Sequence, residues 1–214
     1  MLREHFDIEL NNLREDVLST ASMVEENLMN VTEALLNRDV AVAEQLVAAD
    51  KEINERYIKT VMNSLKLIAT QQPMAGDMRL IAAVIEIMGE LERIHDYVKG
   101  IAKTSLEIGA DGTILPAISE DLPQMARITQ DMLNRSMIAF AENDAVMAKS
   151  IPASDNLVDD LFNRLYAKIV QYASGHPERI PHANQLEWVV HNMERSADRV
   201  INICEWIVYD LSLI

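Results

Sequence analysis

The sequence is poor in the residues that build sheets, tight loops and aromatic cores. It contains only six Gly and six Pro, and its aromatic residues are three Phe, two Trp and five Tyr. Met, by contrast, occurs twelve times. Ala, Leu, Glu and Met, which lose little rotamer freedom in a helix, are common throughout. The composition therefore favours helices over strands.

Membrane-spanning and disulfide-forming features are also missing. No apolar run approaches the roughly 20 residues that cross a bilayer, and the first residues lack the apolar stretch of a signal peptide. The single cysteine, Cys204, can form no disulfide within the chain, which is typical of a reducing compartment. We therefore expect a soluble, cytoplasmic protein.

Basic residues are scarce relative to acidic ones. Asp and Glu number 34 against 19 Lys and Arg, which gives a net charge of −15. Such a surface repels nucleic acid and anionic lipid at long range, so we expect no nucleic-acid partner and membrane contact only through other proteins. It suits metal cations or a basic patch on a partner, although solubility alone would also explain the charge.

Apolar residues recur at helical spacing in six segments, which cover residues 10–35, 46–68, 81–102, 125–139, 158–172 and 186–207. Asp39 is a plausible N-cap of the second helix. Pro152 predicts a kink in the fifth helix or a late start for it. The stretch from Gly109 to Pro123 is the longest one rich in turn residues, and we expect the boundary between two halves there.

The two halves match residue by residue. A shift of 105 pairs Asp39 with Asp144 and Asp50 with Asp155. A shift of 102 pairs other positions of the third and sixth helices: Glu92 with Glu194, Arg93 with Arg195, Asp96 with Asp198, and Val98 with Val200. The pattern indicates a tandem duplication. We predict an all-α protein in which residues 1–108 and 116–214 each form a three-helix bundle, since long helices with short loops pack antiparallel.

The strongest chemical signal is a pair of carboxylates one helical turn apart, present in both halves. Glu92 and Asp96 form one pair and Glu194 and Asp198 the other. Side chains so spaced lie roughly 5–6 Å apart on one face and repel each other, which suggests that a cation lies between them. Oxygen ligands of this kind hold divalent or transition metal ions such as Mg, Mn, Fe or Zn.

Further ligands could come from nearby histidines and from neighbouring helices. His95 and His191 lie beside the two pairs and would favour a transition metal. Glu26 and Asp131, which correspond at the 105 shift, are candidates to complete the coordination.

Two other interpretations of the motifs stay open. Arg93 and Arg195 could pair with the carboxylates in intrahelical salt bridges worth about 0.3–0.5 kcal/mol each, and His95 could be a hydrogen-bonded core residue. The element Glu92-x-x-His95 also resembles that of di-iron carboxylate bundles, which would make the chain a metalloenzyme. That site needs the element twice, whereas the second half has Ala197 after Glu194.

Four segments resemble the PhoU family of phosphate transport system regulatory proteins. They are the run Gln72–Arg79 (QPMAGDMR), the two motif segments Glu90–Asp96 and Asn192–Asp198, and the run Asn202–Tyr209 (NICEWIVY). The resemblance covers nearly the whole chain and respects its internal repeat. His95 and Ser196 depart from the family pattern, and the chain ends soon after Tyr209, where members usually continue.

The resemblance implies two three-helix bundles and metal binding by the E-x-x-x-D motifs, which carries over to Glu92, Asp96, Glu194 and Asp198. It implies negative regulation of the phosphate-starvation response and of phosphate uptake, without enzymatic activity. The partners that it implies are the ATPase subunit of the phosphate ABC transporter and a sensor histidine kinase, between which the protein would act as an adaptor. The Met-rich helical faces also make a homodimer reasonable.

Overall fold

The computed structural model describes residues 2–110 and 112–212, which are helical almost throughout and contain no strand. The first bundle consists of α1 (Leu2–Asn37), α2 (Val40–Gln71) and α3 (Ala75–Ile108). The second consists of α4 (Pro116–Glu142), α5 (Ala145–Ser150), η1 (Ile151–Ser154), α6 (Asp155–Ala173), η2 (Pro177–Arg179) and α7 (Ile180–Asp210). The prediction of an all-α tandem duplication of a three-helix bundle is confirmed. No helix in these described ranges is both long and apolar enough to cross a membrane.

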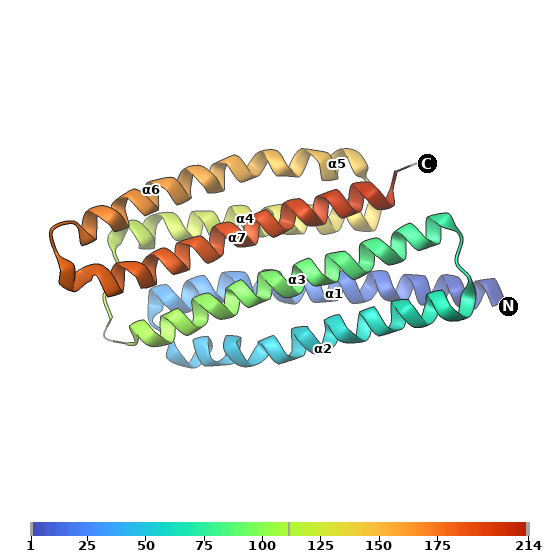
Figure 1. Ribbon diagram of the computed structural model, residues 1–214, viewed down its shortest axis with the longest axis horizontal. Coiled ribbons are helices and arrows are strands. Elements are labelled where there is room, and N and C mark those ends of the chain that lie inside the picture. Colours follow the sequence, from blue (N-terminus) through green and yellow to red (C-terminus); the bar gives the residue numbers. More distant parts are fainter. Residues whose placement is uncertain (1, 111, 213–214) are drawn as a thin grey trace.

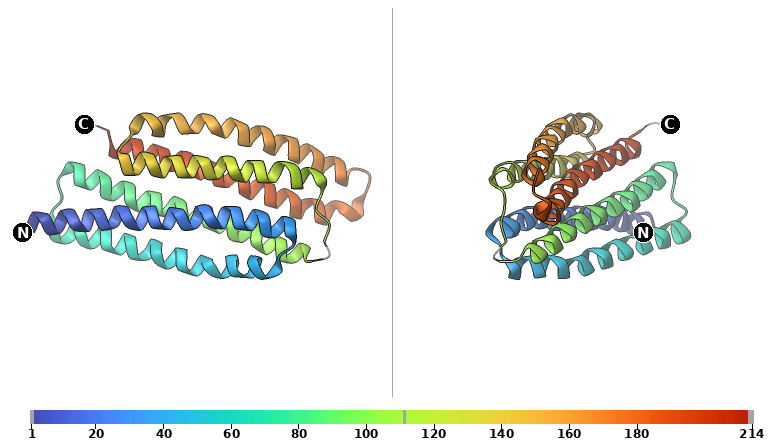
Figure 2. Two further views of the ribbon diagram at one scale, coloured as in Figure 1. Left: turned by 180° about the vertical axis from the view of Figure 1, so that it is seen from behind. Right: turned by 60° about the vertical axis from the view of Figure 1, so that its left-hand side comes forward.

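The two bundles lie side by side with their long axes roughly aligned (Figure 1). Helices α3 and α7, which are repeat counterparts, run antiparallel and form the main contact between the bundles; α1 also packs against α4 (Figure 2). The outer helices, α2 in one bundle and α5–α6 in the other, cover the far sides. The duplicated halves therefore meet around an approximate two-fold axis.

The helix starts follow the chemistry of capping. Asp39 accepts a hydrogen bond from the backbone N–H of Val42 at 3.1 Å, so the predicted N-cap of the second helix is confirmed. Its repeat counterpart Asp144 accepts from Val146 and Met147 at 2.9 Å each. These bonds satisfy backbone donors that have no partner inside the helix.

Prolines shape the second bundle in two ways. Pro152 lies in the 3-10 segment between α5 and α6, which confirms the predicted break. The expected loose stretch, however, is shorter than predicted, because α4 begins at Pro116 and contains Pro123. A proline fits the first turn of a helix, where its missing N–H needs no partner. Pro123 removes one hydrogen bond, which burial of the neighbouring Leu122 and Met125 offsets.

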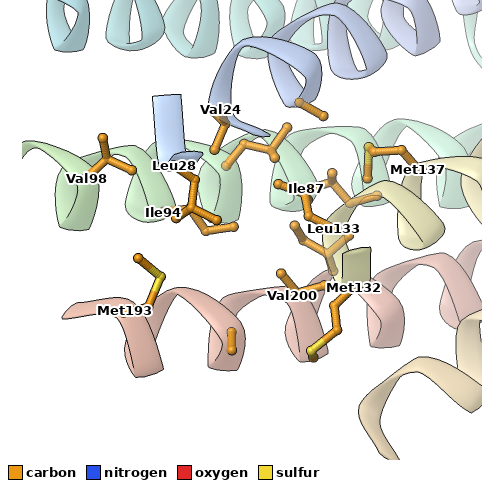
Figure 3. Close-up of a cluster of buried hydrophobic side chains, with 14 of the residues drawn as sticks. Val24, Leu28, Ile87, Ile94, Val98, Met132, Leu133, Met137, Met193 and Val200 are labelled. Carbon is orange, nitrogen blue, oxygen red and sulfur yellow. The ribbon is translucent and has the colours of Figure 1, made fainter. Parts of the chain in front are cut away.

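One apolar core runs through both bundles. The residues that face it at the junction come from four helices and include Val24, Leu28, Ile87, Ile94, Val98, Met132, Leu133, Met137, Met193 and Val200 (Figure 3). All are buried. Because each helix carries one apolar stripe, the face that α3 turns to its own bundle continues into the face that it turns to α7. The two bundles are thus joined by core packing.

Polar side chains are also enclosed at the junction. Arg199 of α7 lies 3.5 Å from Glu90 of α3, and their side chains are only 15% and 11% exposed. Gly100 allows α3 to approach α7 closely, since a Cβ there would lie 2.9 Å from the side-chain nitrogen of Asn192. The buried ion pair fixes how α3 lies along α7, because sliding would separate two enclosed charges.

We predict that Ile94→Ala lowers the free energy of unfolding by about 2–5 kcal/mol, since it opens a cavity in the shared core. Ile94 is fully buried, whereas Ile58 is 59% exposed, so Ile58→Ala should cost no more than about 0.5 kcal/mol. Urea denaturation monitored by circular dichroism measures both. The whole molecule should unfold in one transition, and two separate transitions would contradict the shared core.

Candidate functional site

The paired carboxylates lie on the sides of α3 and α7 that face the outer helices. Glu92 and Asp96 of α3 interact electrostatically with Asp50 of α2 or with its partner Lys99. Glu194 of α7 interacts in the same way with the carboxylate of Asp159 in α6. Since α3 and α7 use another side to pack on each other, each motif faces the outer helix of its own bundle.

In the first bundle the carboxylates already have a cation. We call Asp50, Glu92 and Asp96, with His95 and Lys99, the first cluster. The ammonium of Lys99 lies 2.6 Å from Asp50 Oδ2 and 3.4 Å from Asp96 Oδ1. Burial would raise the pKa of Asp50, but its hydrogen bond to Lys99 and the charges of Lys99 and His95 lower it overall. The Asp50 carboxylate is therefore held ionised by a side chain of the protein.

His95 is enclosed at the centre of the first cluster. It is fully buried, its Nε2 lies 3.1 Å from the side-chain nitrogen of Asn27, and its Nδ1 lies 3.6 Å from Asp50 Oδ1. An amide nitrogen only donates, so Nε2 is the acceptor and the ring proton sits on Nδ1, facing Asp50. Burial lowers the pKa of His95. This arrangement matches the alternative of a hydrogen-bonded core histidine.

In the second bundle four carboxylates of α6 and α7 interact electrostatically. We call Asp155, Asp159, Glu194 and Asp198 the second cluster. Burial, then the charges of Asp159 and Asp198, raise the pKa of Asp155 to about 6. Burial and the charge of Asp198 likewise raise the pKa of Glu194. Glu194 Oε2 is buried and has no hydrogen-bond partner among the described residues, and the nearest cationic candidate is His191 Nδ1 at 3.7 Å.

The repeat makes the two clusters directly comparable. The paired positions of the first and second cluster are Asp50 and Asp155, Asn54 and Asp159, Glu92 and Glu194, His95 and Ala197, Asp96 and Asp198, and Lys99 and Ile201. Three carboxylates and one lysine give the first cluster a formal charge of −2, from −3 and +1, while four carboxylates give the second −4. The same scaffold thus carries two different electrostatic environments.

The structure places the other predicted ligands outside these clusters. Glu26 is exposed on α1. Asp131 of α4 is 65% exposed and lies 3.6 Å from Arg135, one turn further on. The carboxylates whose charges raise the pKa of Glu92 are those of Asp96 and Asp50, and Glu26 is not among them. His191 is half-buried beside the second cluster, in ring contact with Phe162 and Trp188.

Sequence reasoning missed the residues of the outer helices, namely Asp50, Asp155 and Asp159, and the lysine at position 99. One signal was present: Asp50 and Asp155 are identical at corresponding positions of the second helix in each half. An intrahelical salt bridge between Arg93 and Asp96 was one prediction from the sequence. In the structure the cation beside Asp96 is Lys99. In the second bundle, Arg195 interacts electrostatically with Tyr97 of α3, across the bundle junction.

The two clusters differ in how well they suit a metal ion. The first does not fit one, because Lys99 already holds Asp50 and Asn27 holds His95 Nε2. The second fits better, since it offers hard oxygen donors and a buried carboxylate oxygen without a partner. In residues 2–110 and 112–212, no three such side chains stand close enough to hold an ion as they are, so binding would require them to turn inward.

Comparison with known proteins defines the class to which this double bundle belongs. The family model described as PhoU domain matches residues 17–105 and again 122–207. The chain is 30% identical over 208 residues to the phosphate-specific transport system accessory protein PhoU homolog of Streptococcus pneumoniae, which covers 97% of this chain and 95% of that protein. It is 30% identical to PhoU of Escherichia coli, over 95% of this chain and 84% of that protein.

Solved structures agree with this assignment. The crystal structure of the phosphate transport system regulatory protein PhoU from Streptococcus pneumoniae superposes with a TM-score of 0.87 at 29% identity, covering 96% of each chain. PhoU from Pseudomonas aeruginosa superposes with a TM-score of 0.89 at 27% identity, covering 96% of this chain and 98% of that one. The protein is therefore of the phosphate-transport regulator class. It belongs to the PhoU family.

We predict opposite effects for the removal of one negative charge from each cluster in the presence of a chelator. Asp159→Asn should raise the free energy of unfolding by about 0.2–0.5 kcal/mol, because it relieves repulsion with Asp155 one turn away. Asp50→Asn should lower it by about 1–2 kcal/mol, because it weakens a charge-assisted hydrogen bond to Lys99. Urea titrations of both variants measure the two signs. If both substitutions changed the free energy of unfolding in the same direction, the two clusters would not differ electrostatically as described.

Proposed function

We propose that this chain regulates phosphate uptake and represses the phosphate-starvation response when phosphate is plentiful, as a non-enzymatic adaptor on the cytoplasmic side of the membrane. The observation that carries the proposal is the match of both halves to the PhoU domain. Its relatives are named as accessory or regulatory proteins of phosphate transport. The partners that we infer are the ATPase subunit of the phosphate transporter and a sensor histidine kinase.

The surface of α2 supports an adaptor function. Ile58, Met62 and Leu65 follow one another at spacings of four and three residues, and each is at least half exposed. We call these three residues the α2 stripe. Contiguous exposed apolar side chains with polar surroundings are typical of protein contact sites. We assign the α2 stripe to contact with one of the two partners.

A di-iron enzyme is less well supported than a regulator. In the Glu92-x-x-His95 element, the His95 ring lies between Asn27 and Asp50. The repeat counterpart of His95 is Ala197, so the second element that such a site needs is incomplete. A metal ion in this protein would then stabilise helix positions, and the second cluster would hold it through carboxylate oxygens.

Deletion of the gene for this protein in its host should raise expression of a phosphate-starvation reporter several-fold in phosphate-rich medium, because repression is lost. Reintroduction of the unchanged chain should restore repression. Reporter activity and uptake of labelled phosphate are measured side by side. Unchanged reporter expression together with unchanged uptake in the deletion strain would overturn the proposal.

A single charge in the α2 stripe should weaken partner binding. Met62→Asp places a carboxylate at the centre of the α2 stripe, and burying it at an interface should reduce affinity by about tenfold or more, which is about 1.4 kcal/mol. Asn63→Asp adds the same charge on the adjacent exposed residue, off the stripe, and should change affinity less than about twofold. Binding to the purified ATPase and to the kinase is measured for both variants. If both variants lost the same affinity for the partners, the α2 stripe would not be part of the interface.

A further inference from the structure

Aromatic side chains gather on one face of the second bundle, in a chain that contains few of them. Neighbouring ring centroids lie 6.1 Å apart for Tyr166 and Phe162, 6.3 Å for Phe162 and His191, and 6.2 Å for His191 and Trp188. We call these four residues the aromatic patch. Tyr166 on α6 and Trp188 on α7 are 48% and 52% exposed. Both ends of the aromatic patch are therefore open to solvent.

A groove continues from the aromatic patch toward the end of the bundle where α6 is joined to α7 (Figure 1). It has a volume of about 480 Å³, and its lining includes Tyr166, Ile169, Val170, Ile180, Ala183 and Glu187. Val170 and Ile180 are 51% and 48% exposed. We call the groove together with the aromatic patch the α6–α7 groove. Contiguous exposed apolar side chains of this kind are typical of a protein contact site.

The repeat shows that the aromatic patch distinguishes the second bundle from the first. Phe162 corresponds to Tyr57 at the 105 shift, while Trp188 and His191 correspond to Glu86 and Gly89 at the 102 shift. A Cβ at Gly89 would lie 3.8 Å from the Tyr57 ring, so a ring of the outer helix meets the same position in both halves. The second bundle thus has aromatic surface where the first has a carboxylate and a glycine.

Carboxylates border the aromatic patch. Glu187 lines the groove beside it, and Glu194 lies 3.7 Å from His191. Asp159 of α6 adds a further negative charge that acts on Glu194. Arginine side chains stack on aromatic rings and pair with carboxylates. Aromatic rings with an acidic border therefore suit a basic segment of another protein.

The basic side chains of α6 do not neutralise this border. Arg164 is bound through two hydrogen bonds, at 2.8 and 2.7 Å, to Asp121 of α4. Lys168 lies two positions from both Tyr166 and Val170, and side chains so spaced do not share a face of a helix. The acidic border is consequently free of lysine and arginine from the helix that forms one wall of the groove.

We propose that the α6–α7 groove binds a basic amphipathic segment of one partner protein, with its apolar side chains in the groove and its arginines on the aromatic patch. The inference rests on the adaptor function proposed above, and it supplies the second contact surface that an adaptor needs. The α2 stripe lies on the first bundle and the α6–α7 groove on the second (Figure 2). Two partners can thus bind without competing for the same residues.

A charge in the groove tests whether the groove is a docking site. Val170→Asp should reduce affinity for one of the two partners by about tenfold or more, because it would bury an unpaired charge at the interface. Leu157→Asp makes a similar change at a residue of α6 that is 56% exposed. It lies about two and a half turns before Tyr166, on the opposite side of the helix, and should change affinity less than about twofold. Calorimetric titration with the purified ATPase subunit and with the purified kinase measures both variants, and circular dichroism verifies their folding.

A charge reversal tests whether the bound segment is basic. Glu187→Lys should weaken binding to the same partner severalfold, because like charges across an interface repel. Glu205→Lys makes the same exchange at an exposed residue further along α7, and should change affinity less than about twofold. Raising the salt concentration from about 0.15 M to about 0.5 M should weaken binding of the unchanged chain to this partner, since salt screens the attraction.

The outcomes distinguish this inference from the proposed function. If the unchanged chain binds neither partner, the adaptor proposal and the inference fall together. If it binds, but Val170→Asp and Leu157→Asp have the same effect, the inference is wrong and the adaptor proposal stands. If Val170→Asp weakens binding and Glu187→Lys does not, the bound segment is not basic and the inference is wrong. A dimer in analytical ultracentrifugation that Val170→Asp separates would assign the groove to a second copy of the chain and also overturn it.

Discussion

The antiparallel packing of α3 against α7 is the contact on which the rest of the structure depends. It joins the two bundles through buried side chains such as Ile94 and Val200, and the enclosed pair of Glu90 and Arg199 fixes its alignment. The face of a helix that is buried in this contact cannot also carry solvent-exposed carboxylates. Glu92 and Glu194 are consequently turned toward the outer helices, where Asp50 and Asp159 meet them.

Duplication supplies two copies of this geometry, and the copies differ in charge. In the first cluster a lysine bridges Asp50 and Asp96, whereas the second keeps a buried carboxylate oxygen with no hydrogen bond among the described residues.

Much of the fold could be predicted from the sequence, because helical periodicity and capping are local. The six periodic segments, the cap at Asp39 and the break at Pro152 depend on residues within a few positions of one another. The predicted loop extended to Pro123, but α4 begins at Pro116 and contains Pro123. Tertiary packing of that helix outweighs the one hydrogen bond that the proline removes. The spacing of Glu92 and Asp96 indicated the motif but not its partners. Asp50 and Lys99 meet only because α2 and α3 pack at a particular rotation, which no spacing within one helix specifies.

The central claim is that one duplicated scaffold carries two clusters of different charge, the first bridged by its own lysine and the second without a lysine or arginine bridge among the described residues. A high-resolution crystal structure of the unchanged chain tests this claim most directly, because it locates the side chains of both clusters without any substitution. The account predicts the Lys99 ammonium between Asp50 and Asp96, and no lysine or arginine on Asp155 or Glu194. A Lys99 side chain turned away from Asp50, or a lysine or arginine bridging the second cluster, would contradict it.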